Sequence, residues 1–279
     1  MTAPFGVFGL TPAQAFFRRA AARLGDARRG RLAASLLLRA AGGKSGRAFD
    51  VPVFDTECAR LHPYDNISEK RVFITPQFWE AEERAALGRF IANGKGAFCF
   101  LDVGANAGLY TLFARSAARG AGRDFRAICV EPSPEMLARL RFNLEASGAA
   151  GEIAVHDCAA GEREEAAPFR TNAANRGESR VSGDGDRQVR VRTLAAIIDE
   201  AGAARIDAMK IDIEGSEGAA LRGLFSAAGE RFRPAFVIME LSHAGAGAAA
   251  LLGAQGYREV FRTGRNGVFV RSVNPCSNP

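Results

Sequence analysis

Residues 98–108 read FCFLDVGANAG, an apolar run that ends at Asp102 and breaks into a glycine-spaced turn before a helical pattern begins. Residues 129–132 read CVEP, where a second apolar run ends in an acid, Glu131. A strand, a tight turn and a helix, followed by a strand with a terminal carboxylate, are typical of a crevice that binds a nucleoside. The chain is therefore predicted to hold a nucleoside where these two strands end.

Asp102 and the spacing of the glycines indicate which nucleoside this is. A dinucleotide site uses the triplet G-x-G-x-x-G and places a pyrophosphate at the helix N-terminus. This turn has the spacing Gly104-x-Asn106-x-Gly108 instead, and a carboxylate at position 102 would repel a phosphate. S-adenosylmethionine has no phosphate, carries two positive groups and offers ribose hydroxyls as donors. We therefore predict a site for this methyl donor, with an NAD-linked oxidoreductase as the alternative.

Length and composition predict a globular protein without a membrane span. The 279 residues suffice for one large domain, or for a core with an appendage, and no run approaches the roughly eighteen apolar residues of a membrane helix. The N-terminus lacks the basic-then-apolar order of a signal peptide. The five cysteines include no C-x-x-C pair, so we expect free thiols rather than a disulfide or zinc framework, in a cytoplasmic protein.

Most of the excess positive charge lies near the N-terminus. The net charge is +6, and between Arg18 and Arg47 there are eight arginines and one lysine against a single acid, Asp26. This arm either attracts an anionic partner or is a solvated helix face, and we favour the second interpretation. Aromatic residues do not alternate with the basic ones as a nucleic-acid stacking platform requires. We therefore predict no nucleic-acid partner, and peripheral membrane contact through the arm stays open.

From residue 97 onward, apolar runs alternate with helical patterns. The expected strands are 97–103, 126–131, 152–157, 189–191, 206–213 and 235–241, and the expected helices are 107–119, 134–147, 194–201, 217–228 and 246–255. A hairpin with a turn at Asn266-Gly267 follows. This order predicts an α/β fold with a doubly wound, mostly parallel sheet of about seven strands and a C-terminal antiparallel hairpin. Such a hairpin separates methyltransferase-like sheets from dinucleotide folds.

The residues before 97 form further segments. Thr11-Pro12 starts a helical region that runs to about Ala41, with breaks near Gly25 and Gly30, and Pro76–Ile91 reads as another helix. We divide the chain into a basic helical arm (1–48), a cap or substrate-side segment (49–96), a methyltransferase domain (97–274) and a loose tail (275–279).

A third string is more specific than either loop alone. Residues 208–217 read AMKIDIEGSE, and together with DVGANAG at 102–108 and VEP at 130–132 they resemble the FkbM family of S-adenosylmethionine-dependent methyltransferases. The resemblance covers roughly residues 98 to 260. It implies a Rossmann-like fold, S-adenosyl-L-methionine as the cofactor, and methylation of a hydroxyl on a small molecule, sugar or glycan. One departure is Ala195, where the family often has Asp after Thr-Leu.

The predicted cofactor site follows from the strand ends and the turn. Gly104 and Gly108 let the backbone pass close to the methionine end of the cofactor, and Glu131 accepts both ribose hydroxyls. Asn106 either adds a side-chain hydrogen bond or merely tolerates a left-handed turn. The full predicted set is Asp102, Gly104, Asn106, Gly108, Tyr110, Glu131, Pro132, Asp157 and Cys158. The last two stand where the adenine amino group would be read.

Asp212 is the first candidate for the general base. A sugar hydroxyl is a poor acid, so a base helps to remove its proton. The carboxyl end of the strand expected at 206–213 abuts the cofactor in this architecture. Lys210 lies two residues earlier on the same strand face, where it pairs with an acid or holds the acceptor. Glu240 and His243 are alternative bases. These acids do not show a ligand spacing that compels a metal, so we predict none.

Two polar segments, residues 64–66 and 172–182, are predicted to wall the acceptor side, because polar loops of this kind can face the strand ends. Besides the oxidoreductase, the remaining alternative is a non-catalytic, membrane-peripheral module that uses the basic arm.

Overall fold

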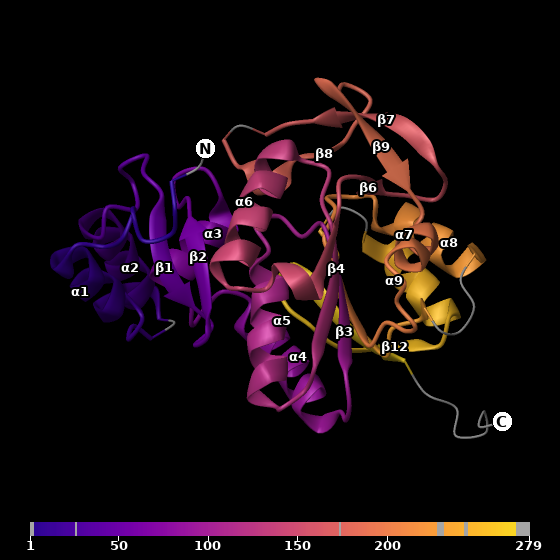
Figure 1. The fold of residues 1–279 in the computed structure, drawn as a ribbon, viewed down its shortest axis with the longest axis horizontal. Coiled ribbons are helices and arrows are strands. Elements are labelled where there is room, and N and C mark those ends of the chain that lie inside the picture. Colours follow the sequence, from indigo (N-terminus) through magenta and orange to yellow (C-terminus); the bar gives the residue numbers. More distant parts are fainter. Residues whose placement is uncertain (1–2, 26, 173, 228–231, 243–244, 272–279) are drawn as a thin grey trace.

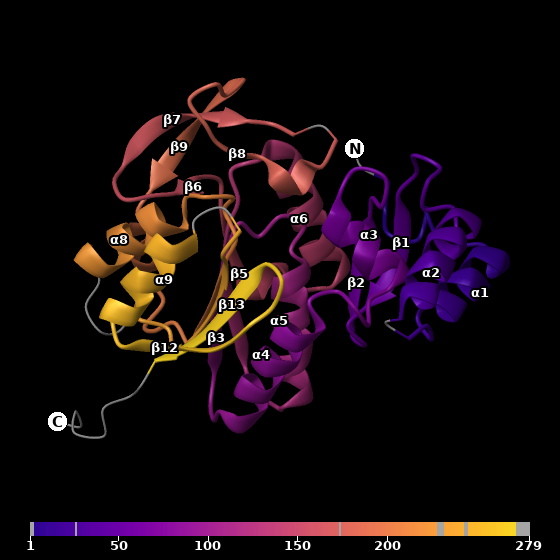
Figure 2. The same ribbon diagram turned by 180° about the vertical axis from the view of Figure 1, so that it is seen from behind.

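The computed structural model describes residues 3–25, 27–172, 174–227, 232–242 and 245–271. A central sheet is covered by helices on both faces, and the N-terminal helices lie at one end of the molecule (Figures 1 and 2). No helix in these ranges is both long and apolar enough to cross a membrane.

The central sheet has seven strands in the order β12-β13-β11-β10-β3-β4-β5. They are β3 (Phe98–Val103), β4 (Phe125–Val130), β5 (Ile153–His156), β10 (Ala208–Ile211), β11 (Phe236–Glu240), β12 (Tyr257–Arg262) and β13 (Asn266–Arg271). The first five pair in parallel, whereas β13 runs antiparallel to both β11 and β12. This confirms the predicted fold. The strand order reverses between β3 and β10, which is where ligands bind in such sheets.

Helices cover each face of this sheet because its strands are apolar on both sides. One face carries α4 (Ala81–Asn93), α5 (Leu109–Gly120) and α6 (Pro134–Ala146), and the other carries α7 (Leu194–Glu200), α8 (Glu217–Ala227) and α9 (Gly245–Ala254). Along β3, Phe98 and Phe100 join the first core, while Leu101 and Val103 join the second. The period of two places successive side chains on opposite faces.

A second, smaller sheet contains strands between residues 157 and 189, where the sequence predicted none. Its strands, in the spatial order β6-β9-β7-β8, are β6 (Ala159–Ala160), β7 (Glu165–Arg170), β8 (Arg180–Val181) and β9 (Arg187–Arg192). The expected strand at 189–191 therefore belongs to this sheet and not to the central one. In β7 the fully buried positions are Ala167 and Phe169, so its apolar pattern is too short to predict a strand.

The N-terminal part begins with two helices and a hairpin. Its elements are α1 (Pro12–Ala21), α2 (Arg28–Ala40), β1 (Phe49–Val53), β2 (Glu57–Leu61) and α3 (Ile67–Ile74). Thr11 and Gln14 form a reciprocal capping box at α1, as expected from a Thr-Pro start. The break predicted near Gly30 is wrong, because Gly30 lies inside α2. A single glycine costs a helix only about 1 kcal/mol, which tertiary packing can outweigh.

Two other boundaries differ from the prediction. Helix α4 begins at Ala81 rather than at residue 76, because Glu80 adopts the left-handed conformation at its N-cap. The Asn266-Gly267 pair starts β13 and does not form the hairpin turn. The buried side chain of Asn266 donates a hydrogen bond to Glu83 at 2.9 Å. That long-range contact holds Asn266 in the strand against its local turn preference.

A buried ion pair joins β2 to the helices beside the central sheet. Arg115 of α5 lies 2.7 Å from Glu57 of β2, and the two residues are 2% and 1% exposed. Arg115 also contacts Glu152, again at 2.7 Å. A buried charge without its partner is costly, so these contacts fix where residues 49–61 sit on the sheet.

We expect Arg115→Met to lower the free energy of unfolding by about 3–5 kcal/mol, because it leaves Glu57 buried and unpaired. The matched control is Arg163→Met, which breaks the exposed pair with Glu165 and should cost less than about 1 kcal/mol. Urea unfolding measures both. Equal losses for the two variants would show that the buried pair does not anchor the hairpin.

Candidate active site

Two cavities meet at the ends of β3, β4 and β10. The first, of about 860 Å³, is lined by Asp102, Glu131 and other residues at the strand ends, with Phe169 and Val181 of the smaller sheet on its far side. The second, of about 1280 Å³, is more polar and extends toward α4 and the β12–β13 hairpin. Both include Glu80, Asn106 and Asp212 in their linings. A ligand in one cavity can therefore reach a ligand in the other.

The turn after β3 is built around a close approach of two backbones. Gly104 has φ +78°, and a Cβ on it would lie 2.0 Å from the carbonyl oxygen of Asp212. The N–H groups of Gly104 and Ala105 both donate to the carbonyl of Val130, at 2.9 and 3.1 Å. Only glycine fits this position. The turn thus ties the ends of β3, β4 and β10 together at the floor of the first cavity.

Glu131 is held by the same turn. Its Oε2 accepts from the backbone N–H of Asn106 at 2.8 Å, and its Oε1 accepts from that of Ser133 at 2.9 Å. Burial raises the pKa of Glu131 to about 7, although both hydrogen bonds act in the opposite direction. Each carboxylate oxygen keeps a further lone pair, so the group suits a ligand that donates through neighbouring hydroxyls.

Asn106 takes the predicted left-handed turn, and its side chain is engaged by the protein itself. The residue has φ +52°, in the left-handed region. Its Oδ1 accepts from the N–H of Ala107 and from the side chain of Asn66, both at 2.8 Å. Asn66 belongs to the segment before α3, so this amide pair joins the turn to the wall of the second cavity.

Lys210 is a buried cation among acids. It lies beside Asp102 on the neighbouring strand, and its Nζ is 2.7 Å from Asp212 Oδ2. Burial alone would lower the pKa of Lys210, but Asp212, Glu80 and Asp102 together raise it well above its ordinary value. The ammonium group therefore stays charged. It also lies 4.9 Å from the ring centroid of Tyr110, a favourable cation–π distance.

Asp102 is 1% exposed and accepts a hydrogen bond from the Thr111 hydroxyl at 2.6 Å. Burial raises the pKa of Asp102, and Lys210 and Thr111 act against that rise. The negative charge near the turn is therefore partly offset by Lys210, which Asp102 shares with Asp212 and Glu80. A ligand near the turn therefore meets the combined charges of Asp102 and Lys210, and not an isolated carboxylate.

Glu80 is a site residue that the sequence did not indicate. Its Oε2 accepts from the Tyr110 hydroxyl at 2.5 Å and from the Asn266 side chain at 3.3 Å. Its Oε1 accepts no hydrogen bond from the residues that the structure describes. The backbone has φ +42° and ψ +50°, a conformation that costs a non-glycine residue on the order of 1–3 kcal/mol and gathers at functional sites. Burial raises the pKa of Glu80, and Lys210 partly offsets this.

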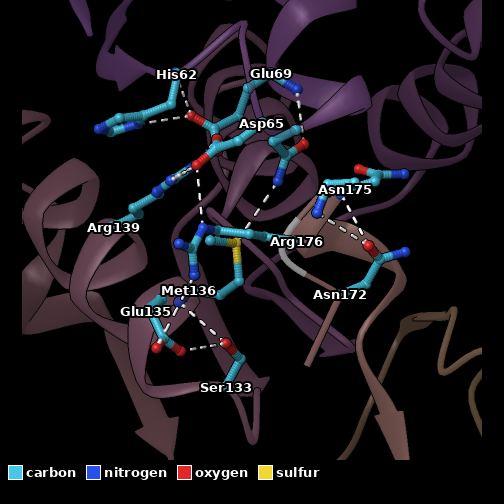
Figure 3. A network of polar contacts seen from close by, with 12 residues as sticks. His62, Asp65, Glu69, Ser133, Glu135, Met136, Arg139, Asn172, Asn175 and Arg176 are labelled. Atoms are coloured by element: carbon cyan, nitrogen blue, oxygen red, sulfur yellow. Dashed lines mark hydrogen bonds and ion pairs between the residues drawn. The ribbon is translucent and has the colours of Figure 1, made fainter. Parts of the chain in front are cut away.

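An ion-pair network holds the far wall of the first cavity, and Figure 3 shows its members coming from three segments of the chain. Arg139 of α6 contacts Asp65 at 2.7 Å and Glu69 at 2.6 Å. Arg176, which lines the first cavity, contacts Asp65 at 3.1 Å and Glu135 at 4.0 Å. Residues 172–182 are thus tied both to α6 and to the segment before α3.

The second cavity is dominated by acids. Among the described residues, seven acidic side chains and two arginines line it. Carboxylate oxygens of Asp212, Glu214 and Glu240 lie within 4.8 Å of one another, which is close enough to share a metal ion. However, Lys210 pairs with Asp212, and Arg265 donates to Glu240 at 3.0 Å. Two of the three charges are therefore balanced by protein cations, and this cluster gives no reason to replace the prediction of no metal.

The remaining predicted residues lie in different places. Pro132 and Tyr110 line the first cavity, and Glu240 lines the second. Gly108 starts α5 and packs toward α6, where Leu140 occupies the space that a side chain would need. Gly108 lines neither cavity, and the same holds for two other predicted residues: Asp157, which is exposed, and Cys158, which is buried in the core beneath α7 and α8. His243 lies outside the described residues.

Comparisons with known proteins agree with this architecture. Residues 102–259 match the family described as the methyltransferase FkbM domain. A solved FkbM methyltransferase from Methylobacillus flagellatus KT is similar, with 21% identity and a TM-score of 0.50 over 93% of this chain. This chain spans 58% of the length of that protein.

Two further solved structures are more distant. The METTL16 methyltransferase domain has 12% identity and a TM-score of 0.49, over 94% of this chain and 93% of that one. A precorrin-6y C5,15-methyltransferase from Geobacter metallireducens GS-15 has 11% identity and a TM-score of 0.44, over 70% and 89%. Curated protein sequences give no match. Because the family match covers more than half of the chain, this protein belongs to the FkbM family of S-adenosylmethionine-dependent methyltransferases.

Proposed function

We propose that the protein transfers a methyl group to a hydroxyl of a neutral or cationic small molecule, sugar or glycan. The observation that carries this proposal is the junction of the two cavities at Asp212 and Glu80. One cavity suits a phosphate-free nucleoside, and the other is polar, acid-lined and large enough for a polyhydroxylated molecule. Carboxylates at such a junction are suited to accept a proton from a hydroxyl.

The first cavity fits S-adenosylmethionine by the chemistry of its lining. Glu131 offers two fixed acceptors for the ribose hydroxyls, and Asp102 and Asp212 suit the positive groups of the cofactor. Met136 and Phe169 offer apolar surface for the adenine ring, which we assign to them in preference to Asp157 and Cys158. When bound, the cofactor supplies a methyl group already activated by its sulfonium, so the protein must chiefly align the reactants and exclude water.

We assign the general base to Asp212. Lys210 holds Oδ2 of this carboxylate at 2.7 Å, while Oδ1 accepts no hydrogen bond from the described part of the chain. The side chain is 31% exposed at the junction, where an acceptor hydroxyl would lie. With the cofactor bound, Asp212 would take the proton of the acceptor hydroxyl, while the methyl group would exchange its bond to the sulfonium sulfur for a bond to the acceptor oxygen and leave S-adenosylhomocysteine as the neutral thioether. Lys210 fixes the carboxylate and keeps a positive charge beside it.

The charge of the second cavity narrows the class of acceptor. Its acids outnumber its arginines seven to two among the described residues, so a phosphorylated or carboxylated acceptor would meet like charges. A neutral or amine-bearing polyol would instead find acceptors for its hydroxyl and ammonium groups. Asn66 and Ser68 in its wall support our assignment of residues 49–96 as the acceptor-side cap.

The acceptor class is tested with three sugars of different charge. They are the methyl glycosides of glucose, glucosamine and glucuronic acid. Radiolabelled S-adenosylmethionine should label the first two at least about tenfold more than the uronic acid, because the cavity repels its carboxylate. Mass spectrometry of the product locates the methyl group. Preferred labelling of the uronic acid would contradict the charge argument, and a methyl group on nitrogen would contradict hydroxyl methylation.

Cofactor affinity should depend on pH through Glu131. Its pKa is raised to about 7, so below that pH the carboxyl is protonated and loses acceptor capacity for the ribose hydroxyls. Calorimetric titration with S-adenosylhomocysteine should show weaker binding as the pH falls below 7, by at most about tenfold per pH unit. Glu131→Gln should bind weakly at every pH without this slope, whereas the exposed control Glu145→Gln should retain it. A slope that persists in Glu131→Gln would assign it to another group.

Asp212→Asn should depress the single-turnover rate of methyl transfer by about 10²–10⁴-fold, because the amide cannot take the proton. Affinity for S-adenosylhomocysteine should change little, since this product lacks the sulfonium charge that Asp212 would face and Asn still accepts from Lys210. The matched variant is Glu240→Gln, the other predicted base, which should keep most of the rate. Rapid-quench measurements with the best sugar of the panel decide between them. Slow methyl transfer by Glu240→Gln together with fast transfer by Asp212→Asn would instead assign the general base to Glu240 at the end of β11.

A further inference from the structure

The outward face of α2 carries two exposed leucines among its charged side chains. Leu32 and Leu36 stand one turn apart on the same side of the helix and are 64% and 72% exposed. On the opposite side Leu38 is buried and Leu37 is partly buried against the core. Two leucines of α2 therefore pack against the core, and two others are exposed to solvent.

Three arginines flank these exposed leucines. Arg28 precedes Leu32 by one turn, Arg29 precedes it by three residues, and Arg39 follows Leu36 by three residues. All three are exposed, and none makes an ion pair with a residue in the described ranges. Their side chains are long enough to extend beside the leucines and keep their charged ends at a polar boundary.

Helix α1 repeats the arrangement on a smaller scale. Phe16 is 60% exposed, and the exposed Arg19 follows it by three residues. Figures 1 and 2 both show α1 and α2 side by side at the end of the molecule away from α8 and α9. Asp26 is the one acid before Asp50, and from residue 48 onward acids slightly outnumber bases. The positive charge of the chain is thus concentrated at this end.

We propose that the exposed face of α1 and α2 docks on an anionic membrane surface. Leu32, Leu36 and Phe16 would enter the boundary between headgroups and acyl chains, while the arginines contact lipid phosphates. This proposal departs from the preference for a merely solvated helix face, because a solvated face does not need exposed leucines. The proposal does not depend on the identity of the methyl acceptor.

Two other occupants fit less well. Nucleic acid would engage the arginines, but base stacking uses aromatic rings and the leucines would have no counterpart. A second copy of the chain would place this face against itself in a two-fold dimer, so Arg28, Arg29 and Arg39 would meet the same arginines. A lipid surface satisfies both the apolar and the cationic groups at once.

The full chain is tested by flotation with vesicles of pure phosphatidylcholine and with vesicles that also contain phosphatidylglycerol. We expect binding to the anionic vesicles only, weakening as salt screens the arginines. The double variant Leu32→Ser, Leu36→Ser should partition at least about tenfold less, and Arg28→Glu with Arg39→Glu should abolish binding. The matched control is Val260→Ser, which changes an exposed apolar residue of β12 and should bind like the parent chain.

Unchanged affinity for S-adenosylhomocysteine shows that each variant is folded, because none of these residues lines either cavity. Absence of binding to anionic vesicles would overturn the proposal, as would equal binding to both lipids or an unaffected leucine variant. Self-association that the leucine variant abolishes, without vesicle binding, would assign the face to a second copy. RNA binding that needs the arginines but not the leucines would assign it to nucleic acid.

Discussion

The buried ammonium group of Lys210 is the constraint on which the site depends. Glu80, Asp102 and Asp212 approach one another at the point where the strand order reverses, and three carboxylates there would repel in a medium that screens poorly. Lys210 projects among them from the middle of β10. Its positive charge offsets part of the repulsion between the carboxylates in the ligand-free protein. The acids required for a cationic cofactor can then be in place before the cofactor arrives.

This balance changes the meaning of Asp102. From the sequence alone, its carboxylate argues against a pyrophosphate by direct repulsion. In the structure Asp102 is buried, accepts a hydrogen bond from Thr111 and lies opposite Lys210 on the neighbouring strand. The positive charge of Lys210 therefore reduces the repulsion that Asp102 would exert on a phosphate. The stronger reason against an NAD-linked oxidoreductase is the family match over residues 102–259.

Sequence reasoning succeeded where local pattern and tertiary structure agree. Strands β3 and β4 are each buried at all but one position and have clear boundaries, so their positions and that of Glu131 could be read directly. It failed where distant contacts decide. Asn266 begins a strand because Glu83 binds it, and Glu80 enters the site through a left-handed backbone and contacts with Tyr110 and Asn266. Neither contact leaves a periodic signal in the chain.

The position of Glu80 makes the two cavities thermodynamically dependent on each other. One carboxyl group lines both, so a cation in the first cavity favours its ionised form, and that form is the better acceptor for a hydroxyl in the second. Linkage requires the coupling to be reciprocal: whatever the first ligand does for the second, the second does for the first. A single strained residue at the start of α4 can therefore make the binding of the two ligands cooperative without any movement of the domains.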